Sequence, residues 1–427
     1  MNMEDIKNIL EKEYLINIID ISKSDESTVG NVYIIYTNNS KYVLKIYDNK
    51  KHTESITLLH TNLSSKFYIP KIIFNKDSNL YIQISSNYMV LFSFLEGIQI
   101  GKLDRIDDNI IINIAKELRK LHDETSINDY KLDEVKCDIE RKSLLHFDLT
   151  KGNIFYNEGK IGFIDFDDSK YGPSIYDVAI IMCLLFFSKK KGIDKNNIKL
   201  FLDTYYEYDN DLKYKEVKYI KEIAINWIND VLANTEFNPS TKESFEVKKN
   251  LIQEYNFNNI ELKLFKECIN EELYNMYQDI PASEIGSTNK INGLTYEEFL
   301  NVCDEYIKEE KEINKELNTT TQRYILYDNE ILVGEVGIRT TINDFWKNKG
   351  SQIYYKIRIS KRGKGYGNLI LSLALEKAKE IGFKEVRINC DNNNIASKKI
   401  ILNNGGKEDI IDYKTNDGYS TSYIINL

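Results

Sequence analysis

The pattern of apolar and polar residues predicts two regions that each mix strands with helices. In the first half, β-rich composition predicts strands at 31–36, 42–47, 80–84 and 89–94, with a hairpin turn at 37–40. Apolar residues at helical spacing predict helices at 52–63, 109–122, 176–190 and 217–233. Most of the predicted strands therefore precede the long helices.

The second half repeats this alternation after a change in composition. Residues 236–257 contain Pro239 with several Ser and Thr and have weak periodicity, which predicts a linker. Beyond it, the pattern predicts strands at 323–327, 331–339, 352–359 and 385–390, and an amphipathic helix at 368–381 closed by Gly382. We expect one domain at 1–235 and another at 258–427, with a fold class of α+β and α/β.

Composition narrows the class of protein. The 427 residues carry 57 Lys and Arg against 66 Asp and Glu, a net charge of −9, which argues against a nucleic-acid binder and favours a cationic small-molecule partner. The longest apolar run, 178–187, is half of the ~20 residues that a membrane helix needs, so we expect no membrane insertion. Five dispersed cysteines form no C-x-x-C pair, and their odd number favours a reducing, cytoplasmic location. Nothing in the sequence indicates an oligomeric state.

A first group of chemistry-bearing residues lies within 144–179. The motif H-x-D-x-x-x-x-N places Asp148 five residues before Asn153, and the motif I-D-F-D places Asp165 twelve residues further on. Phosphoryl transfer requires an oriented hydroxyl and a triphosphate neutralised by Mg²⁺. Asp148 can accept the hydroxyl proton, and Asn153 and Asp165 can bind the metal. Asp, Gly and Asn also favour simple turns, but the combined spacing is far more specific than any single residue.

Upstream residues fit a nucleotide site. Lys45 is the one cation in an apolar strand, where a lysine that binds phosphates would sit, although a solvent-facing strand lysine is the alternative. Glu54 can pair with Lys45 from the next helix, but surface helices are rich in Glu. Gly30 lies between the first two strands and could help to cover the phosphates. The segment that contains Ser93 and Leu95 follows an apolar strand and predicts a hinge that offers backbone groups to the base.

On these residues, the first domain resembles the aminoglycoside phosphotransferase and choline-kinase-like family, which has the two-lobed protein-kinase fold. The resemblance implies that Asp148 is the catalytic base, that Asn153 and Asp165 bind Mg²⁺, and that Lys45 contacts the phosphates of ATP or GTP. It also implies that Asp177, in a P-x-x-x-D-x-A context, braces the catalytic loop.

Two departures bear on the acceptor. Position 147 is Phe rather than Arg, and no A-P-E segment follows, which favours a small-molecule kinase over a protein kinase switched by phosphorylation. The region available for an acceptor lobe is short, so the acceptor stays open.

A second group of residues follows the predicted strand at 352–359. The segment that links this strand to the next helix consists of Arg362, Gly363, Lys364, Gly365, Tyr366 and Gly367. Glycines at a helix N-terminus leave successive N–H groups exposed, and such a nest binds pyrophosphate. An ordinary basic turn and a dinucleotide-binding loop are the alternatives, but the order here is R-x-x-G-x-G rather than G-x-G-x-x-G.

With Asn394 before a short helix that ends in glycine, residues 258–427 resemble the GNAT N-acetyltransferase family. The resemblance implies that acetyl-CoA binds with its pyrophosphate on the glycine-rich segment, its pantetheine arm along Ile357 to Ile359, and Asn394 near the point where two strands separate. The reaction would be direct acyl transfer to an amine.

Acid–base groups for this transfer are less clear. Many relatives place a tyrosine, the proton donor to the leaving thiol, where this chain has Ile401, so another tyrosine or a water must substitute. Glu335 is a candidate base, with a solvent-facing strand residue as the alternative.

The combined hypothesis is a bifunctional transferase that uses ATP or GTP with Mg²⁺ to phosphorylate a hydroxyl and acetyl-CoA to acetylate an amine. Aminoglycosides are cationic and carry both groups, so they are the natural common substrate. The alternative is a small-molecule or protein Ser/Thr kinase with a CoA-binding regulatory domain.

Overall fold

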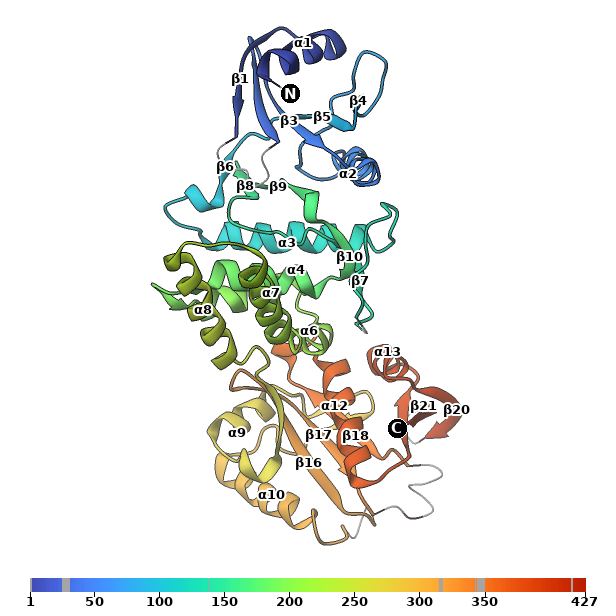
Figure 1. The fold of residues 1–427 in the computed structure, drawn as a ribbon. Helices are drawn as coiled ribbons and strands as arrows, with labels where there is room; N and C mark the ends of the chain where they lie inside the picture. The colour runs from blue at the N-terminus through green and yellow to red at the C-terminus, as the bar shows by residue number, and fades with distance from the viewer. Residues whose placement is uncertain are drawn as a thin grey trace. The chain divides into compact units, whose positions relative to one another are not determined.

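The structure is a computed structural model that describes residues 2–24, 31–137, 139–314, 318–341, 343, 350–415 and 418–427. The chain forms two compact units. The N-terminal unit comprises Met1–Tyr205 and Tyr219–Tyr255, and the C-terminal unit comprises Tyr206–Lys218 and Asn256–Leu427. Both units mix helices with strands (Figure 1), which confirms the predicted class.

The N-terminal unit begins with an antiparallel sheet of strand order β1-β2-β3-β5-β4. Its strands are β1 (Ile18–Lys23), β2 (Val32–Thr37), β3 (Lys41–Tyr47), β4 (Ile82–Ile84) and β5 (Asn87–Ser93). The predicted hairpin is β2–β3, in which Ile34 lies opposite Val43. Helix α1 (Met3–Tyr14) packs Ile6 and Leu10 into the sheet core, and α2 (Lys50–Leu63) follows β3.

The rest of this unit is mainly helical. Its helices are α3 (Asp108–Glu124), α4 (Ile175–Phe186), α5 (Lys195–Tyr205), α7 (Ile220–Asn234) and α8 (Pro239–Glu254). Its short strands are β6 (Ile98–Gln99), β7 (Lys142–Leu145), β8 (Ile154–Asn157), β9 (Lys160–Phe163), β10 (Lys170–Pro173), β11 (Phe187–Ser188) and β12 (Gly192–Ile193). Helix α4 is buried along most of its length, because it carries most of the longest apolar run of the chain. No helix in the described ranges is long and apolar enough to cross a membrane.

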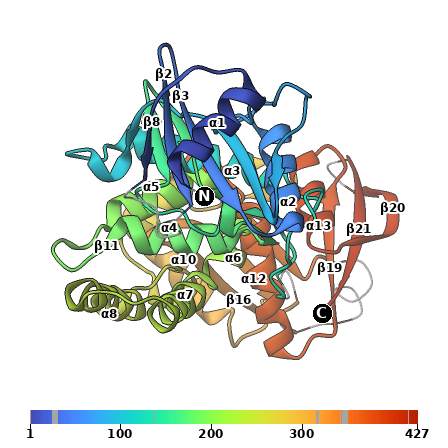
Figure 2. The same ribbon diagram turned by 45° about the horizontal axis from the view of Figure 1, so that its top comes forward.

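The predicted linker at 236–257 is mostly the helix α8. Asn238 accepts a hydrogen bond from the Thr241 N–H as the N-cap, and Pro239 occupies the first helical position, so the Pro that suggested a break begins a helix instead. Helix α8 lies beside α7 in both ribbon views (Figures 1 and 2). The Lys249 ammonium donates to the Asn229 side chain at 2.8 Å across this pair.

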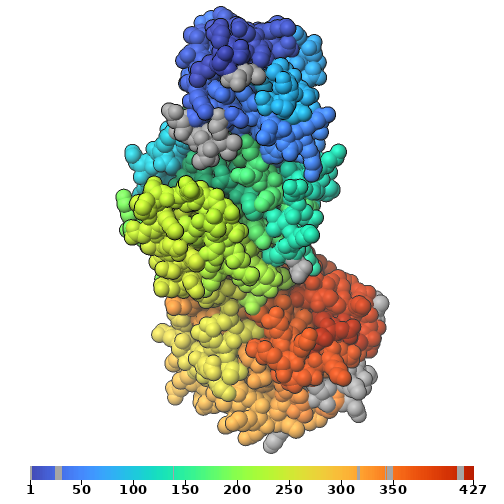
Figure 3. Space-filling model, in the orientation of Figure 1, coloured from blue at the N-terminus to red at the C-terminus, as the bar shows by residue number. Residues whose placement is uncertain are grey.

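The C-terminal unit contains two separate antiparallel sheets, of order β13-β16-β17-β18 and β19-β21-β20. Their strands are β13 (Ile260–Leu264), β16 (Thr321–Asp328), β17 (Ile331–Arg339), β18 (Ile353–Ile357), β19 (Glu385–Asp391), β20 (Lys407–Thr415) and β21 (Gly418–Asn426). The remaining elements are the hairpin β14 (Ser283–Glu284) and β15 (Ser287–Thr288), and the helices α9 (Glu271–Gln278), α10 (Tyr296–Lys308), α12 (Tyr366–Ile381) and α13 (Ile395–Asn403). Figure 3 shows the yellow and orange residues of this unit packed directly against its red C-terminal residues.

Strands β18 and β19 separate from each other along their length. The Gln352 N–H donates to the Arg387 carbonyl at 2.8 Å just before β18, but no ladder joins the two strands themselves within the part of the chain that is described. Strands β18 and β19 therefore each have an edge that is not paired with the other.

One helix from the first half of the sequence belongs to the C-terminal unit. Helix α6 (Asn210–Val217) packs on α12, and the Asn210 side chain donates to the Lys364 carbonyl at 2.7 Å. The N-terminal unit ends at Tyr255, within the predicted linker 236–257, but the predicted domain 1–235 loses α6 to the C-terminal unit. Helix α6 finds its packing partner more than 150 residues away in the sequence.

Candidate functional sites

The N-terminal unit contains a cleft of about 2070 Å³. Its walls come from the antiparallel sheet, from the loop after β7 and from α7. Five of the predicted residues line it, namely Lys45, Leu95, Asp148, Asn153 and Asp165. The structure thus brings together residues that are up to 120 positions apart in the chain.

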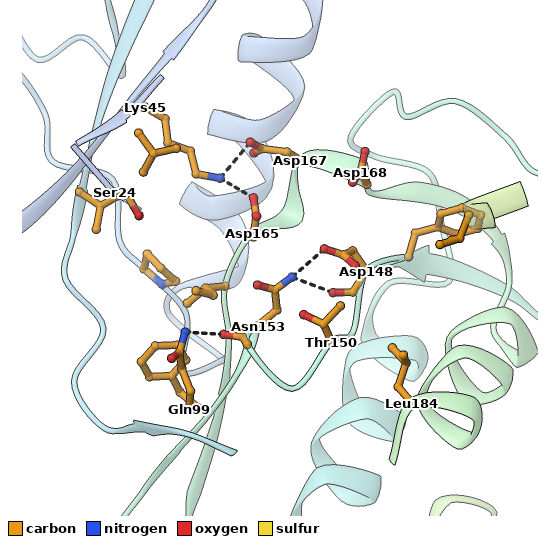
Figure 4. Close-up of a pocket in the computed structure, with 18 of the residues that line it drawn as sticks. Ser24, Lys45, Gln99, Asp148, Thr150, Asn153, Asp165, Asp167, Asp168 and Leu184 are labelled. Carbon is orange, nitrogen blue, oxygen red and sulfur yellow. Dashed lines mark hydrogen bonds and ion pairs between the residues drawn. The ribbon is translucent and has the colours of Figure 1, made fainter. Parts of the chain in front are cut away.

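Lys45 lies between two carboxylates in this cleft (Figure 4). Its ammonium is 2.6 Å from Asp165 Oδ1 and 2.9 Å from Asp167 Oδ2, and its side chain is only 14% exposed, so the alternative of a solvent-facing lysine is wrong. Burial by itself lowers the pKa of Lys45, but the charges of Asp167 and Asp165 outweigh it and the pKa is raised. Lys45 is therefore held as a cation.

Asp167 and Tyr47 belong to this cluster and were not among the predicted site residues. Asp167 also accepts a hydrogen bond from the Tyr47 hydroxyl at 2.9 Å. Tyr47 lies two residues after Lys45 on β3, and the period of two along a strand places both side chains on one face. That spacing is the signal that could have found Tyr47.

Asp148 and Asn153 face each other within one loop (Figure 4). The Asn153 side-chain amide donates to Asp148 Oδ2 at 2.7 Å and to the Asp148 carbonyl at 2.9 Å. Burial raises the pKa of Asp148, the nearby His146 opposes this, and the carboxylates of Asp165 and Asp168 add to it. A carboxylate with a raised pKa is a better proton acceptor than an ordinary aspartate.

Asp177 holds the start of this loop. It is fully buried at the beginning of α4, and its two oxygens accept the backbone N–H groups of His146 at 2.7 Å and Phe147 at 2.8 Å. Phe147 has a φ of +68°, which is uncommon for a residue with a side chain. The two hydrogen bonds stabilise this backbone conformation immediately before Asp148.

Two of the predicted nucleotide-site residues, Glu54 and Ser93, do not fit the expectation, and a third is not described. Glu54 is 52% exposed and contacts Lys50 and Tyr81 rather than Lys45, so the predicted pairing is wrong. Helix α2 buries a face that includes Thr53 and Thr57. Glu54 is next to Thr53 in the sequence and therefore lies outside this buried face. Ser93 is not among the lining residues, because its N–H and hydroxyl bond to Lys71 at the end of the sheet. Gly30 lies outside the described residues.

Helix α7 forms one side of the cleft, and none of its residues was predicted to line a site. Trp227 and Asp230 line the cleft from this helix, and Phe237 lines it just beyond. Aromatic residues at helical spacing usually belong to the hydrophobic core. The sequence pattern therefore did not mark these residues as lining a binding cleft.

In the C-terminal unit, the glycine-rich segment leads into the N-terminus of α12. Gly363 and Gly365 have φ values of +71° and +74°, which residues with side chains rarely adopt. A Cβ on Gly363 would meet nothing within 4 Å, whereas one on Gly365 would lie 2.7 Å from the Asn210 nitrogen. Gly363 therefore borders open space, and Gly365 allows α6 to approach.

Arg362 and Asn394 both contact the short hairpin β14–β15. The Arg362 guanidinium forms a bidentate pair with Glu284 at 2.5 and 2.8 Å. Asn394 caps α13 by accepting from the Ser397 N–H at 3.0 Å, and its amide donates to the Ile285 carbonyl at 3.1 Å. The hairpin thus links the glycine-rich segment to the start of α13.

Two backbone groups on the predicted path of the pantetheine arm form hydrogen bonds within the protein. Strand β18 ends at Ile357, and the Ile357 carbonyl accepts from the Arg362 side chain at 2.8 Å. Ile359 lies in the following 3₁₀ turn, where its N–H donates to the Asp279 carbonyl at 3.1 Å, so this N–H is already used. Tyr366 turns its side chain into the core, where its hydroxyl bonds to Asp328, so only its backbone faces the segment.

Glu335 does not face solvent. It is 1% exposed, and its oxygens accept the hydroxyls of Tyr277 at 2.8 Å and Tyr354 at 2.9 Å. Burial and the Glu335 charge raise the pKa of both tyrosines well above the ordinary value. With both oxygens occupied, Glu335 is poorly placed to accept a proton from an external amine. Ile401 is fully buried and offers no proton.

Comparison with solved structures gives three examples of similarity. A spectinomycin phosphotransferase in complex with AMP has 16% identity and a TM-score of 0.47, covering 59% of this chain and 98% of that chain. An amicoumacin kinase has 15% identity and a TM-score of 0.47, covering 60% and 95%. A microcompartment-associated aminopropanol kinase has 13% identity and a TM-score of 0.42, covering 58% and 95%. Comparison with curated protein sequences finds no match.

Family models match two separate parts of the chain. Residues 136–201 match the phosphotransferase enzyme family, abbreviated APH, and residues 274–407 match the acetyltransferase (GNAT) domain. The chain joins an APH phosphotransferase domain to a GNAT acetyltransferase domain. The first match contains Asp148, Asn153 and Asp165, and the second contains the glycine-rich segment and Asn394.

The phosphotransferase residues fit an Mg²⁺-nucleotide. Mg²⁺ in such sites is bound by one or two protein groups together with phosphate oxygens. Asn153 uses its amide nitrogen toward Asp148, which leaves its amide oxygen as a ligand beside Asp165. In the described ranges no group of three His, Cys, Asp or Glu is arranged for a metal, so phosphate oxygens would complete the coordination.

The part of the glycine-rich segment around Gly363 fits the pyrophosphate of acetyl-CoA, whereas Asp209 and Asn210 lie against Gly365. The first turn of α12 leaves N–H groups without intrahelical acceptors, and the helix dipole favours an anion there. The open space beside Gly363 gives the phosphates access to the backbone.

Proposed function

We propose that the phosphotransferase domain transfers the γ-phosphoryl group of ATP or GTP, with Mg²⁺, to a hydroxyl of a small cationic molecule, and that the acetyltransferase domain acetylates an amine of the same class of molecule. Aminoglycosides are the substrates we propose. The observation that carries the proposal is the meeting of Lys45, Asp148, Asn153 and Asp165 in one cleft.

Each of these residues has a distinct task in phosphoryl transfer. Asp148, whose pKa is raised by burial, accepts the proton of the acceptor hydroxyl. Lys45 is a buried cation that would bind the nucleotide phosphates. Mg²⁺ would neutralise charge on the phosphates, held by Asn153 and Asp165.

The cleft also suits a cationic acceptor. Asp168 and Asp230 contribute carboxylates, and Trp227, Phe147 and Tyr176 contribute aromatic surfaces to its lining. Carboxylates attract ammonium groups, and aromatic faces bind them by cation–π interactions of about 0.5–2 kcal/mol each.

A second candidate is a phosphotransferase whose acetyltransferase domain binds CoA without turnover. The buried Ile401, at the position where a proton donor was expected, favours it.

The test uses the purified full chain, an aminoglycoside panel, ATP or GTP, and acetyl-CoA, with products separated by mass spectrometry. Asp148→Ala should abolish phosphorylated product and keep acetylated product, because Asp148 lies in the cleft of the N-terminal unit. Gly363→Trp should do the reverse, since its side chain would fill the open space beside the pyrophosphate loop. Asp104→Asn, an exposed charge removal in the N-terminal unit, is the control. Absence of both products with every aminoglycoside would refute the proposed substrate class.

A further inference from the structure

Among the polar links between the segment of β18 and the segment of β19 and α13, one joins two hydroxyl groups. The Tyr355 hydroxyl, from β18, lies 3.0 Å from the Ser397 hydroxyl in the first turn of α13. The phenol ring is partly buried against the core of the C-terminal unit. A tyrosine hydroxyl therefore lies where the two sheets separate, with its oxygen next to a helix N-terminus.

A thioester whose pantetheine arm follows β18 would have its reacting end near this position. The pyrophosphate loop follows the end of β18, so a pantetheine arm that follows the strand from this loop runs back along it. Tyr355 lies two residues before the last residue of the strand, about 7 Å along that path at ~3.3 Å per residue. Its neighbours on either side in the strand, Tyr354 and Lys356, belong to the opposite face, where Tyr354 bonds Glu335.

We propose that Tyr355 is the proton donor to the departing CoA thiolate and that Ser397 positions it. The proposal rests on the proposed acetyltransferase activity. The amine nitrogen forms a bond to the acetyl carbon, the C–S bond breaks, and its electron pair stays on sulfur. The Tyr355 hydroxyl gives its proton to that sulfur and becomes a phenolate. The proton lost by the amine passes through water and Ser397 to the phenolate, which restores the tyrosine.

The surroundings of Tyr355 suit this task. Its hydroxyl lies 3.0 Å from that of Ser397, whose side chain also hydrogen-bonds the Cys390 thiol, and the Asn394 cap fixes the Ser397 N–H. The positive end of α13 stabilises negative charge on the phenolate or the thiolate while the proton moves. Burial raises the pKa of Tyr355 to about 12, and the hydrogen bond from Ser397 opposes that rise, so the hydroxyl is protonated at neutral pH.

The experiment compares the full chain with Tyr355→Phe, Ser397→Ala and the control Tyr419→Phe, whose side chain is 55% exposed in the same unit. The measurements are kcat and KM for acetyl-CoA with a panel of primary amines (aminoglycosides, polyamines and amino alcohols), the Kd for CoA by calorimetry, and Tm. We expect Tyr355→Phe to lower kcat about 100-fold with unchanged Kd and Tm, the lower end of what a general acid contributes. Ser397→Ala should lower kcat by a smaller factor, again with unchanged Kd, and Tyr419→Phe should match the unaltered chain.

Two results would overturn the inference alone. One is an active unaltered chain with an unchanged kcat in Tyr355→Phe. The other is a fall in kcat with an equal loss of CoA affinity and Tm, which is what a merely structural bridge predicts. An unaltered chain that binds CoA but transfers acetyl to no amine would refute the acetyltransferase part of the proposed function, and this inference with it.

Discussion

Replacing Asp177 by Asn tests how the catalytic loop is held. The carboxylate accepts one backbone N–H on each oxygen, at 2.7 Å from His146 and 2.8 Å from Phe147. An amide of the same size has a single acceptor oxygen, and its NH₂ group faces the second N–H as donor against donor. The substitution therefore changes hydrogen bonding without removing volume.

The structure sets the size of the effect. A hydrogen bond to a charged group contributes about 1.5–3 kcal/mol, and a buried N–H without an acceptor costs about 1–3 kcal/mol. Asp177 is fully buried, so solvent does not replace the lost partner. We expect a loss of about 3 kcal/mol, which for a unit of this size lowers Tm by about 6–12 °C. A shift of about 1 Å in Asp148 would also slow phosphoryl transfer by about 100-fold.

Calorimetry of the full chain measures the first effect, and initial rates with ATP and an aminoglycoside measure the second. Asp104→Asn makes the same chemical change at an exposed position and should leave both unaltered. A Tm and rate equal to those of the unaltered chain would refute the reasoning. A lowered Tm with an unchanged rate of phosphoryl transfer would mean that Asp177 stabilises the core but does not position Asp148.

Three further predictions concern the two sites. Because transfer requires the carboxylate form of Asp148, whose pKa is raised, kcat/KM for phosphoryl transfer should fall as pH drops through that raised pKa, and Asp168→Asn should move the fall to lower pH. A pH profile that does not move would contradict this. Glu284→Gln frees the guanidinium of Arg362 for phosphate, so calorimetry should show CoA binding tightened by about fivefold, most strongly at low salt. Asn210→Ala removes a hydrogen bond to the glycine-rich segment and should weaken CoA binding by about fivefold while phosphoryl transfer is kept, and an equal Kd would count against a role for α6.

Local sequence was enough to predict most of the elements and to select the residues of both candidate sites. One short loop brings Asp148 and Asn153 together, so their spacing of five residues is enough to predict that their side chains are close. The glycine-rich segment depends on its backbone conformation at the start of α12, and glycine residues indicate the positive φ angles of that conformation directly. The hairpin β2–β3 and the Gly382 cap are also local, because they depend on a few consecutive residues.

Contacts between distant segments decided the rest. Periodicity shows that a segment has a buried face, but which partner that face meets depends on the packing free energy of the whole unit. That is why Lys45 pairs with Asp165 and Asp167 rather than with Glu54. The same reason explains why Glu335 is buried beneath two tyrosines and why α6 packs with the C-terminal unit. The separation of β18 from β19, which places Tyr355 opposite Ser397, likewise exists only once two sheets have formed.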